Sequence, residues 1–151
     1  MEIARAELGV HETPGTSATQ RVVEYHKATT LPAKLATSDE VSWCSSFVCW
    51  VFEPRIGETR FGFVSTRSAM ARSWCTWGAA VTEPVIGAVV VFPRGMDPRQ
   101  GHVGLVAGFD ATTIQVLGGN QSNSVSIKPF LRRDALTFRW PWMPEGREFG
   151  R

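Results

Sequence analysis

The amino-acid sequence predicts an α+β domain in which helices pack on an antiparallel sheet. Two observations lead to this prediction. In the first half of the chain apolar residues recur at helical spacing, whereas from Val81 onward they form short continuous runs between turn residues. A chain of 151 residues suits one domain. We therefore expect a single domain over residues 1–151, helical over about residues 1–80 and β-rich over about residues 81–142.

Composition and charge exclude several classes of protein. Hydrophobic residues make up 43% of the chain and charged residues 20%, which excludes a disordered chain, a collagen and a coiled coil. No apolar run approaches the roughly 18 residues that a membrane span needs. The net charge of +2 is too small to predict a nucleic-acid partner. Three cysteines without a CxxC cluster predict neither a disulfide scaffold nor a structural zinc site, and we expect no metal and no cofactor.

Helical spacing and stop signals define four predicted helices in the first half, over residues 2–10, 19–27, 43–52 and 65–77. Gly9 ends the first of them, Pro54 closes the third and Gly78 stops the fourth. The polar residues 29–42 are predicted as a loop. The third segment is a compact apolar block, and a strand is its competing interpretation because it is short and rich in β-formers.

The second half is predicted to form an antiparallel meander. Its strands lie over residues 87–92, 102–109, 114–117, 125–127 and 136–140, and residues 110–113 form a turn.

Cys44 lies in the first turn of the predicted helix over residues 43–52, with Ser42 as its N-cap. A thiol at this place meets free backbone N–H groups and the positive end of the helix dipole, which both favour a thiolate. We therefore expect a lowered pKa for Cys44, and its own N–H could form half of an oxyanion hole. The competing interpretation is a small core hydrophobe, which is the one we prefer for Cys49.

His102 opens a predicted strand directly after Gly101, at a strand end that faces a loop, where sites are usually built. His11 and His26 carry no comparable signal, and we interpret them as structural or surface residues.

Asn120 follows the strand expected to pair with the His102 strand. Placing Asn120 directly opposite His102 needs a cross-strand index sum of 222, whereas a four-residue turn over residues 110–113 gives 223. A three-residue loop, or a bulge at Gly118 and Gly119, would correct the register. With that correction Cys44, His102 and Asn120 have the chemistry of a nucleophile, a base and an orienting residue.

Several sequence blocks resemble the CHAP and NlpC/P60 papain-like superfamily of peptidoglycan hydrolases, and look most like its small phage- and prophage-encoded branch. The blocks are DEVSWCSSFVCW over residues 39–50, ARSWxxWG over 71–78, GHVGLV over 101–106 and LGGNQS over 117–122, together with AxxELGVxExPG over 4–15. The resemblance extends over residues 4–142.

This resemblance implies a papain-like α+β core in which Cys44 is the nucleophile, His102 the general base and Asn120 the orienting residue. The implied reaction is hydrolysis of an amide in peptidoglycan, either between sugar and peptide or within the stem peptide. Two positions depart from the pattern. Ala88 stands where many relatives have Asp, and Gly118 stands where CHAP members often have Glu.

Five further residues are candidates for binding substrate. Trp43, Trp74 and Trp77 could wall a groove, with core packing as the alternative for each. Asp39, together with Glu40, could hold a cation or a substrate amine or form part of a solvated loop, and Gln121 adjoins Asn120. A second oxyanion donor would come from the loop before the helix, from Ser38 or Asp39.

Bacterial peptidoglycan is the expected partner of a monomeric enzyme, with an immunity protein in addition if the protein is an antibacterial effector. The chain starts without a basic n-region or a long apolar h-region. We therefore expect synthesis in the cytoplasm and release to the wall through a holin or a secretion system. The alternatives are a papain-like amidase or acyltransferase for a protein or lipid substrate, and a non-catalytic wall-binding module.

The C-terminal residues 128–151 carry more basic than acidic side chains. They form a solvated tail or, alternatively, a surface that holds the protein near an anionic wall, in which case Arg147 and Arg151 would contribute.

Overall fold

The computed structural model describes residues 1–15, 17–53 and 64–141, so Arg147 and Arg151 lie outside the described residues. The described helices are α1 (Glu2–Ala6), α2 (Gln20–Lys27), α3 (Ala33–Ala36), α4 (Cys44–Phe52) and the 3₁₀ turns η1 (Ala71–Thr76) and η2 (Arg132–Asp134). The described strands are β1 (Ala79–Val81), β2 (Val89–Pro93), β3 (Gly101–Phe109), β4 (Thr113–Gly118), β5 (Ser126–Leu131) and β6 (Thr137–Trp140).

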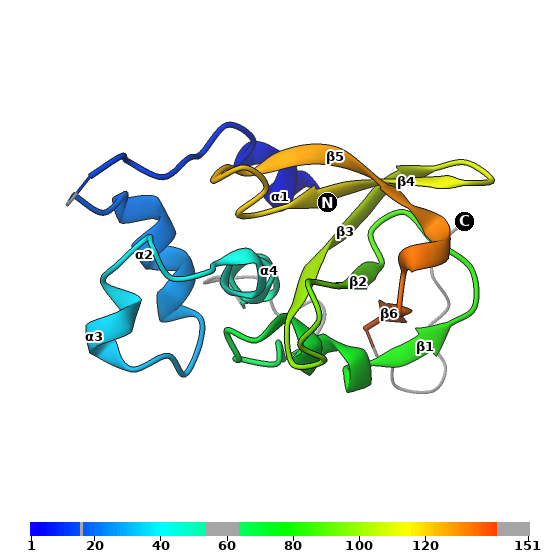
Figure 1. Cartoon of the computed structure of the whole chain (residues 1–151), viewed down its shortest axis with the longest axis horizontal. Helices are drawn as coiled ribbons and strands as arrows, with labels where there is room; N and C mark the ends of the chain where they lie inside the picture. Colours follow the sequence, from blue (N-terminus) through cyan, green and yellow to red (C-terminus); the bar gives the residue numbers. More distant parts are fainter. Residues whose placement is uncertain (16, 54–63, 142–151) are drawn as a thin grey trace.

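These strands form one antiparallel sheet in the order β1-β6-β2-β3-β4-β5. Helix α4 lies between this sheet and the pair α2 and α3 (Figure 1). The α+β class is therefore confirmed. The expected meander holds for β2 to β5, but β6 returns to the other side of β2 and pairs with β1 as well. None of the described helices is long and apolar enough to cross a membrane.

The apolar block that begins at Trp43 forms helix α4. Its helical interpretation is therefore confirmed, and the alternative of a strand is wrong. The predicted helix over residues 65–77 is wrong for most of its length, since only η1 is helical. Its first half is rich in Ser and Thr, whose hydroxyls accept hydrogen bonds from backbone N–H groups two residues further on, at Arg67, Ser68 and Met70. Such local bonds compete with helix formation. The predicted loop over residues 29–42 contains the short helix α3.

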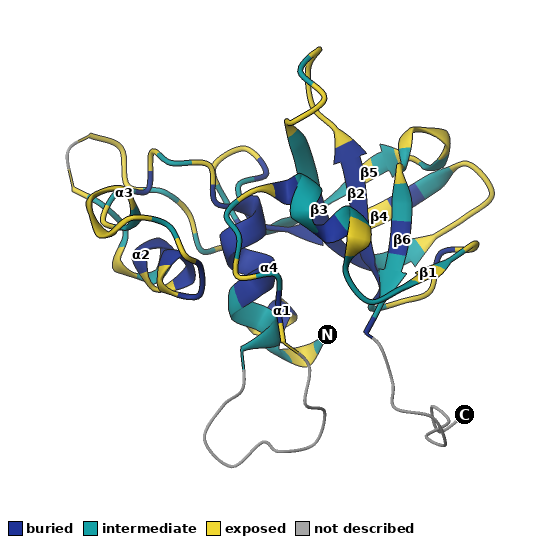
Figure 2. Ribbon diagram, turned by 90° about the horizontal axis from the view of Figure 1, so that it is seen from below, coloured by how far each residue is buried: buried dark blue, intermediate teal, exposed yellow. Residues whose placement is uncertain are grey.

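The two faces of the sheet are both buried. Val89, Val103 and Leu105 belong to the face that packs against α4 and η1, and the alternating residues Val90 and Val106 belong to the opposite face. Figure 2 shows the buried segments of α4 and of the central strands next to each other. The site-bearing elements are thus fixed by the main core of the protein.

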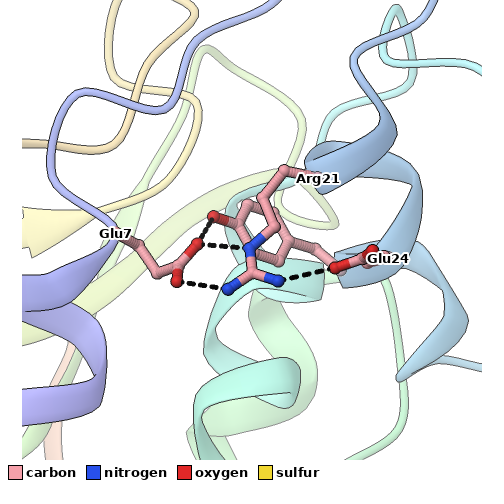
Figure 3. A network of polar contacts seen from close by, with 4 residues as sticks. Glu7, Arg21 and Glu24 are labelled. Carbon is pink, nitrogen blue, oxygen red and sulfur yellow. Dashed lines mark hydrogen bonds and ion pairs between the residues drawn. The ribbon is translucent and has the colours of Figure 1, made fainter.

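A charged cluster ties the N-terminal segment to α2 (Figure 3). The buried carboxylate of Glu7 accepts two hydrogen bonds from Arg21, at 2.6 and 2.7 Å, and one from the hydroxyl of Tyr25, at 2.5 Å. Arg21 also pairs with Glu24 and lies 4.6 Å above the ring of Trp50 on α4. Burial, followed by the bond to Glu7, raises the pKa of Tyr25. The cluster therefore fastens α1 and α2 to the helix that carries Cys44.

The start of α4 approaches the end of β4 so closely that only glycine fits at position 119. A Cβ atom on Gly119 would lie 2.7 Å from Phe47 Cβ and 2.7 Å from the ring of Trp43. Side-chain contacts below 3.0 Å force neighbours to move, and both neighbours here are fully buried. The second glycine of the LGGNQS block is therefore a packing requirement of the helix–sheet junction.

The substitution Gly119→Ala should destabilise the protein by about 1–3 kcal/mol, because it overpacks a filled core. Urea unfolding measures the loss. Gly108→Ala on β3 is the matched control, since its Cβ would meet nothing closer than 3.8 Å. Equal stability of the two variants would contradict the close packing of α4 on β4.

Candidate active site

Cys44 is the first residue of α4 and is only 2% exposed. The backbone N–H of Val103 on β3 and the Ser42 side chain both favour the thiolate form of Cys44, so both groups face the thiol. Ser42 is not the N-cap that the sequence predicted: Trp43 occupies that position, without a side-chain cap bond. The Ser42 hydroxyl is instead one of the groups that face the thiol.

Burial raises the pKa of the Cys44 thiol, although Val103 N–H, the Ser42 side chain and Ser45 N–H all act to lower it. The expected lowering is therefore wrong. The sequence indicates the helix dipole and the free N–H groups at the helix start, which both lower the pKa of a thiol. It does not indicate the loss of hydration, which disfavours the charged thiolate and has the largest effect on this pKa.

His102 is the second residue of β3 and is partly buried. It lies opposite Phe92 on β2, and its ring is stacked on Phe130 of β5, with 5.3 Å between ring centroids and an interplanar angle of 7°. Burial lowers the pKa of His102, as does the positive charge of Arg94. With the raised pKa of Cys44, this favours a neutral thiol and a neutral imidazole near neutral pH.

Gln121 determines which ring nitrogen of His102 carries the proton. The Gln121 amide nitrogen donates to the carbonyl oxygens of Val116, at 3.2 Å, and Ser126, at 2.7 Å. Because carbonyl oxygens only accept, the amide oxygen must be the atom 3.0 Å from His102 Nε2. Nε2 therefore donates, and in the neutral ring Nδ1 keeps the lone pair that a general base needs. Gln121 is buried and His102 partly buried, so this bond is shielded from much of the solvent.

The register of β3 and β4 reaches the index sum that would place Asn120 opposite His102, although not through the predicted bulge. Phe109 pairs with Ile114 next to the turn, but Leu105 pairs with Leu117, so the index sum changes from 223 to the required 222. The bulge that corrects it lies between Val106 and Gly108, not at the predicted glycine pair.

Asn120 does not continue this strand, because its φ is +56°, in the left-handed region that Asn tolerates better than most residues. The chain turns there, and the next side chain reaches the imidazole.

Asn120 contacts the start of α4 instead. With its amide oriented by the surrounding donors and acceptors, the oxygen accepts from Trp43 N–H at 3.2 Å and the nitrogen donates to Glu12 at 3.3 Å. Glu12 also accepts from the Trp43 indole N–H at 2.7 Å. Glu12 and Asn120 therefore hold the residue directly before Cys44.

The tryptophans at positions 43 and 74 are fully buried, so they form core and not the walls of a groove. The indole N–H of Trp74 donates to Ser45 at 2.9 Å. Trp77 is half-buried, packs against the ring of Phe52 in a tilted arrangement and donates from its indole N–H to Val64 O. Their packing supports α4 from the side of η1.

Asp39 is buried and caps backbone N–H groups. Its carboxylate accepts from Thr19 at 2.8 Å, at the start of α2, and from Thr13 at 3.2 Å. Burial acts to raise the pKa of Asp39, but these hydrogen bonds outweigh it and hold the pKa below its usual range. The Ser38 hydroxyl accepts from Glu40 N–H in a local turn. Ser38 and Asp39 are therefore occupied within the loop, whereas the Ser42 side chain faces the thiol.

Three features of this site escaped sequence reasoning: the roles of Ser42 and Gln121, and the nearness of Arg94. Ser42 was predicted to cap the helix because it precedes an apolar block. A serine that faces the thiol would stand at the same position, so the sequence does not separate the two roles. Gln121 was considered only for substrate contacts because a straight strand would place Asn120 opposite His102. No local pattern marks Arg94, which comes near the site through the hairpin between β2 and β3.

No group of three or more His, Cys, Asp or Glu side chains suitable for a metal ion occurs within residues 1–15, 17–53 and 64–141.

In comparisons with known proteins, a family model described as CHAP domain matches residues 36–120, more than half of the chain. This segment includes Cys44, His102 and Asn120, and it ends one residue before Gln121. Searches of curated proteins and of solved structures gave no match.

Replacing Gln121 by Met should release the His102 tautomer, because Met fills a similar volume without accepting the Nε2 proton. Nitrogen NMR of the imidazole should show Nε2–H in the parent protein and a mixture of tautomers in Gln121→Met. Asn120→Ala is the control and should leave the tautomer unchanged. The opposite result would restore Asn120 as the partner of His102.

The raised pKa predicts that Cys44 reacts slowly with iodoacetamide at about pH 6 and progressively faster up to about pH 9, as its thiolate forms. Peptide mass spectrometry identifies the labelled residue, with the half-buried Cys75 as an internal reference. A labelling rate for Cys44 that is already maximal below about pH 7 would instead indicate a preformed thiolate–imidazolium pair.

Proposed function

Since the chain belongs to the CHAP domain family, we propose that it is a cysteine hydrolase that cleaves an amide bond in bacterial peptidoglycan. Membership of this family indicates amidase or peptidase activity on peptidoglycan. The observation that carries the proposal for this chain is a helix-start thiol that faces β3 beside a histidine whose tautomer is fixed. Cys44 faces the peptide N–H that follows His102, and Gln121 leaves Nδ1 of His102 as the basic nitrogen.

In the proposed mechanism the neutral thiol is activated only when substrate is present. Cys44 Sγ attacks the amide carbon while its proton passes to Nδ1 of His102. The imidazolium then gives this proton to the leaving nitrogen as the carbon–nitrogen bond breaks, which leaves a thioester. Water attacks the thioester, His102 takes one of its protons, and the sulfur leaves as the carbon–sulfur bond breaks and regains the proton.

The negative charge that develops on the substrate oxygen needs donors near the start of α4. The backbone N–H of Cys44 has no partner within its own helix, and we assign it the first place in the oxyanion hole. The Ser42 hydroxyl, which already faces the thiol, is the second donor in this proposal. Gln121 and Asn120 are positioning residues, which act on His102 and on Trp43 respectively.

The scissile bond is either the junction of N-acetylmuramic acid with L-alanine or a bond within the stem peptide. This chemistry is compatible with two settings. A phage enzyme would lyse its host cell from within, whereas an antibacterial effector would attack a competitor and would be accompanied by an immunity protein. An amidase or acyltransferase for a protein or lipid substrate would use the same residues. A wall-binding module would not need the fixed tautomer of His102.

Cys44→Ala and His102→Ala should each abolish lysis of purified cell walls, with losses of at least about 1000-fold, because members of one catalytic unit fail together. Turbidity measures the lysis, and mass spectrometry of the digested wall identifies the bond that is cut. Cys75→Ser is the matched control and should stay active. Wall binding without any new fragment in the mass spectrum would support the binding module and reject the hydrolase.

A further inference from the structure

The hairpin between β2 and β3 begins next to His102. The last cross-strand pairs of these strands are Phe92 with His102 and Pro93 with Gly101, so Arg94 is the first residue beyond the ladder. Figure 2 shows this hairpin rising from the ends of the two strands, mostly in the colour of exposed residues. A side chain at its base is therefore accessible from solvent and adjacent to the site.

Arg94 acts on both members of the Cys44–His102 pair. Its positive charge lowers the pKa of the thiol and that of the imidazole, and its backbone directly follows the strand end that pairs with Gly101 and His102. Arg94 is exposed, and in the part of the chain that the structure describes no carboxylate pairs with it. The acidic residue of its own hairpin, Asp97, is held by Arg99 through contacts of 2.9 and 3.1 Å.

A second guanidinium reaches the same strand end from η1. Arg72 donates from Nε to the carbonyl oxygen of Gln100 at 2.8 Å. Its Cδ and Nε atoms lie 3.3 Å from the point that a Cβ on Gly101 would occupy, so the missing side chain of Gly101 makes room for it. Arg72 and Arg94 therefore flank the start of β3, where two like charges attract an anion.

We propose that Arg94 and Arg72 form a subsite that binds a free carboxylate of the substrate next to the scissile amide. The inference rests on the proposed function and adds a substrate preference to it. A guanidinium presents paired N–H donors that match a carboxylate, and it remains charged at every physiological pH. Stem peptides carry free carboxylates beside their amide bonds, and amidation of such a carboxylate removes its charge. The subsite should therefore distinguish the acid from the amide.

The test uses two soluble stem peptides that differ in one group: the α-carboxylate of the D-glutamate residue is free in one and amidated in the other. The parent protein should cleave the free acid with a kcat/KM about tenfold higher, the size expected for a charged hydrogen bond that is partly exposed. Arg94→Gln should remove this preference, mainly through KM for the free acid. Arg99→Gln, in the same hairpin, is the matched control and should retain it.

The amidated peptide separates binding from any change in the Cys44–His102 pair, because an effect of Arg94 on their pKa values would appear with both peptides. Equal losses on the two peptides would therefore overturn the subsite. A second measurement does not depend on catalysis: the Cys44→Ala variant should bind the free acid more tightly than the amide, and Arg94→Gln in that background should abolish the difference. If the parent protein cleaves neither peptides nor walls, the proposed function fails, and this binding difference alone decides the subsite.

Discussion

The close approach of α4 to the end of β4 is the constraint on which the rest of the structure depends. A helix start can approach a strand end this closely only where the strand lacks a side chain, which is the case at Gly119. The same approach brings Cys44 to the N–H of Val103 and places Asn120 against Trp43. One packing contact therefore sets the distance between the thiol on the helix and the imidazole on the sheet.

Several polar groups around α4 form hydrogen bonds that support this contact. Trp43 donates to Glu12, Trp74 donates to Ser45, and Ser46 bonds to His26 of α2 at 2.9 Å. Buried donors without partners are costly, so each of these pairs favours one orientation of the helix. The aromatic residues that surround α4 therefore serve to hold this helix in place. The hairpin after β2 forms the exposed surface near the site.

The electrostatics of the site follow from its burial. A helix start favours a thiolate, but a thiol with almost no exposed surface loses more through dehydration than it gains from nearby N–H groups. The raised pKa of the thiol and the lowered pKa of the imidazole both favour a neutral pair near neutral pH. Gln121 suits such a pair, because a neutral amide fixes the ring without stabilising the imidazolium as strongly as a carboxylate would.

The sequence by itself determined the elements with strong local signals. These are α2, the helix that begins at Cys44, the strands β2 to β4, and the positions of the thiol and the imidazole at the ends of their elements. Each depends on periodicity or on Gly and Pro, which act within a few residues. In the segment before η1, Ser and Thr hydroxyls form hydrogen bonds with backbone N–H groups, and there the helical spacing of apolar residues predicted a helix that does not form.

Only the tertiary structure decided which side chains meet. The bulge between Val106 and Gly108 sets the pairing of β3 with β4, and the left-handed turn at Asn120 then gives His102 a different partner, Gln121. The bulge displaces the pairing by one residue, and in a strand such a displacement exchanges the two faces. Burial raises the pKa of Cys44 for a comparable reason, because desolvation is a property of the packed molecule and has no signature in the neighbouring residues of the chain.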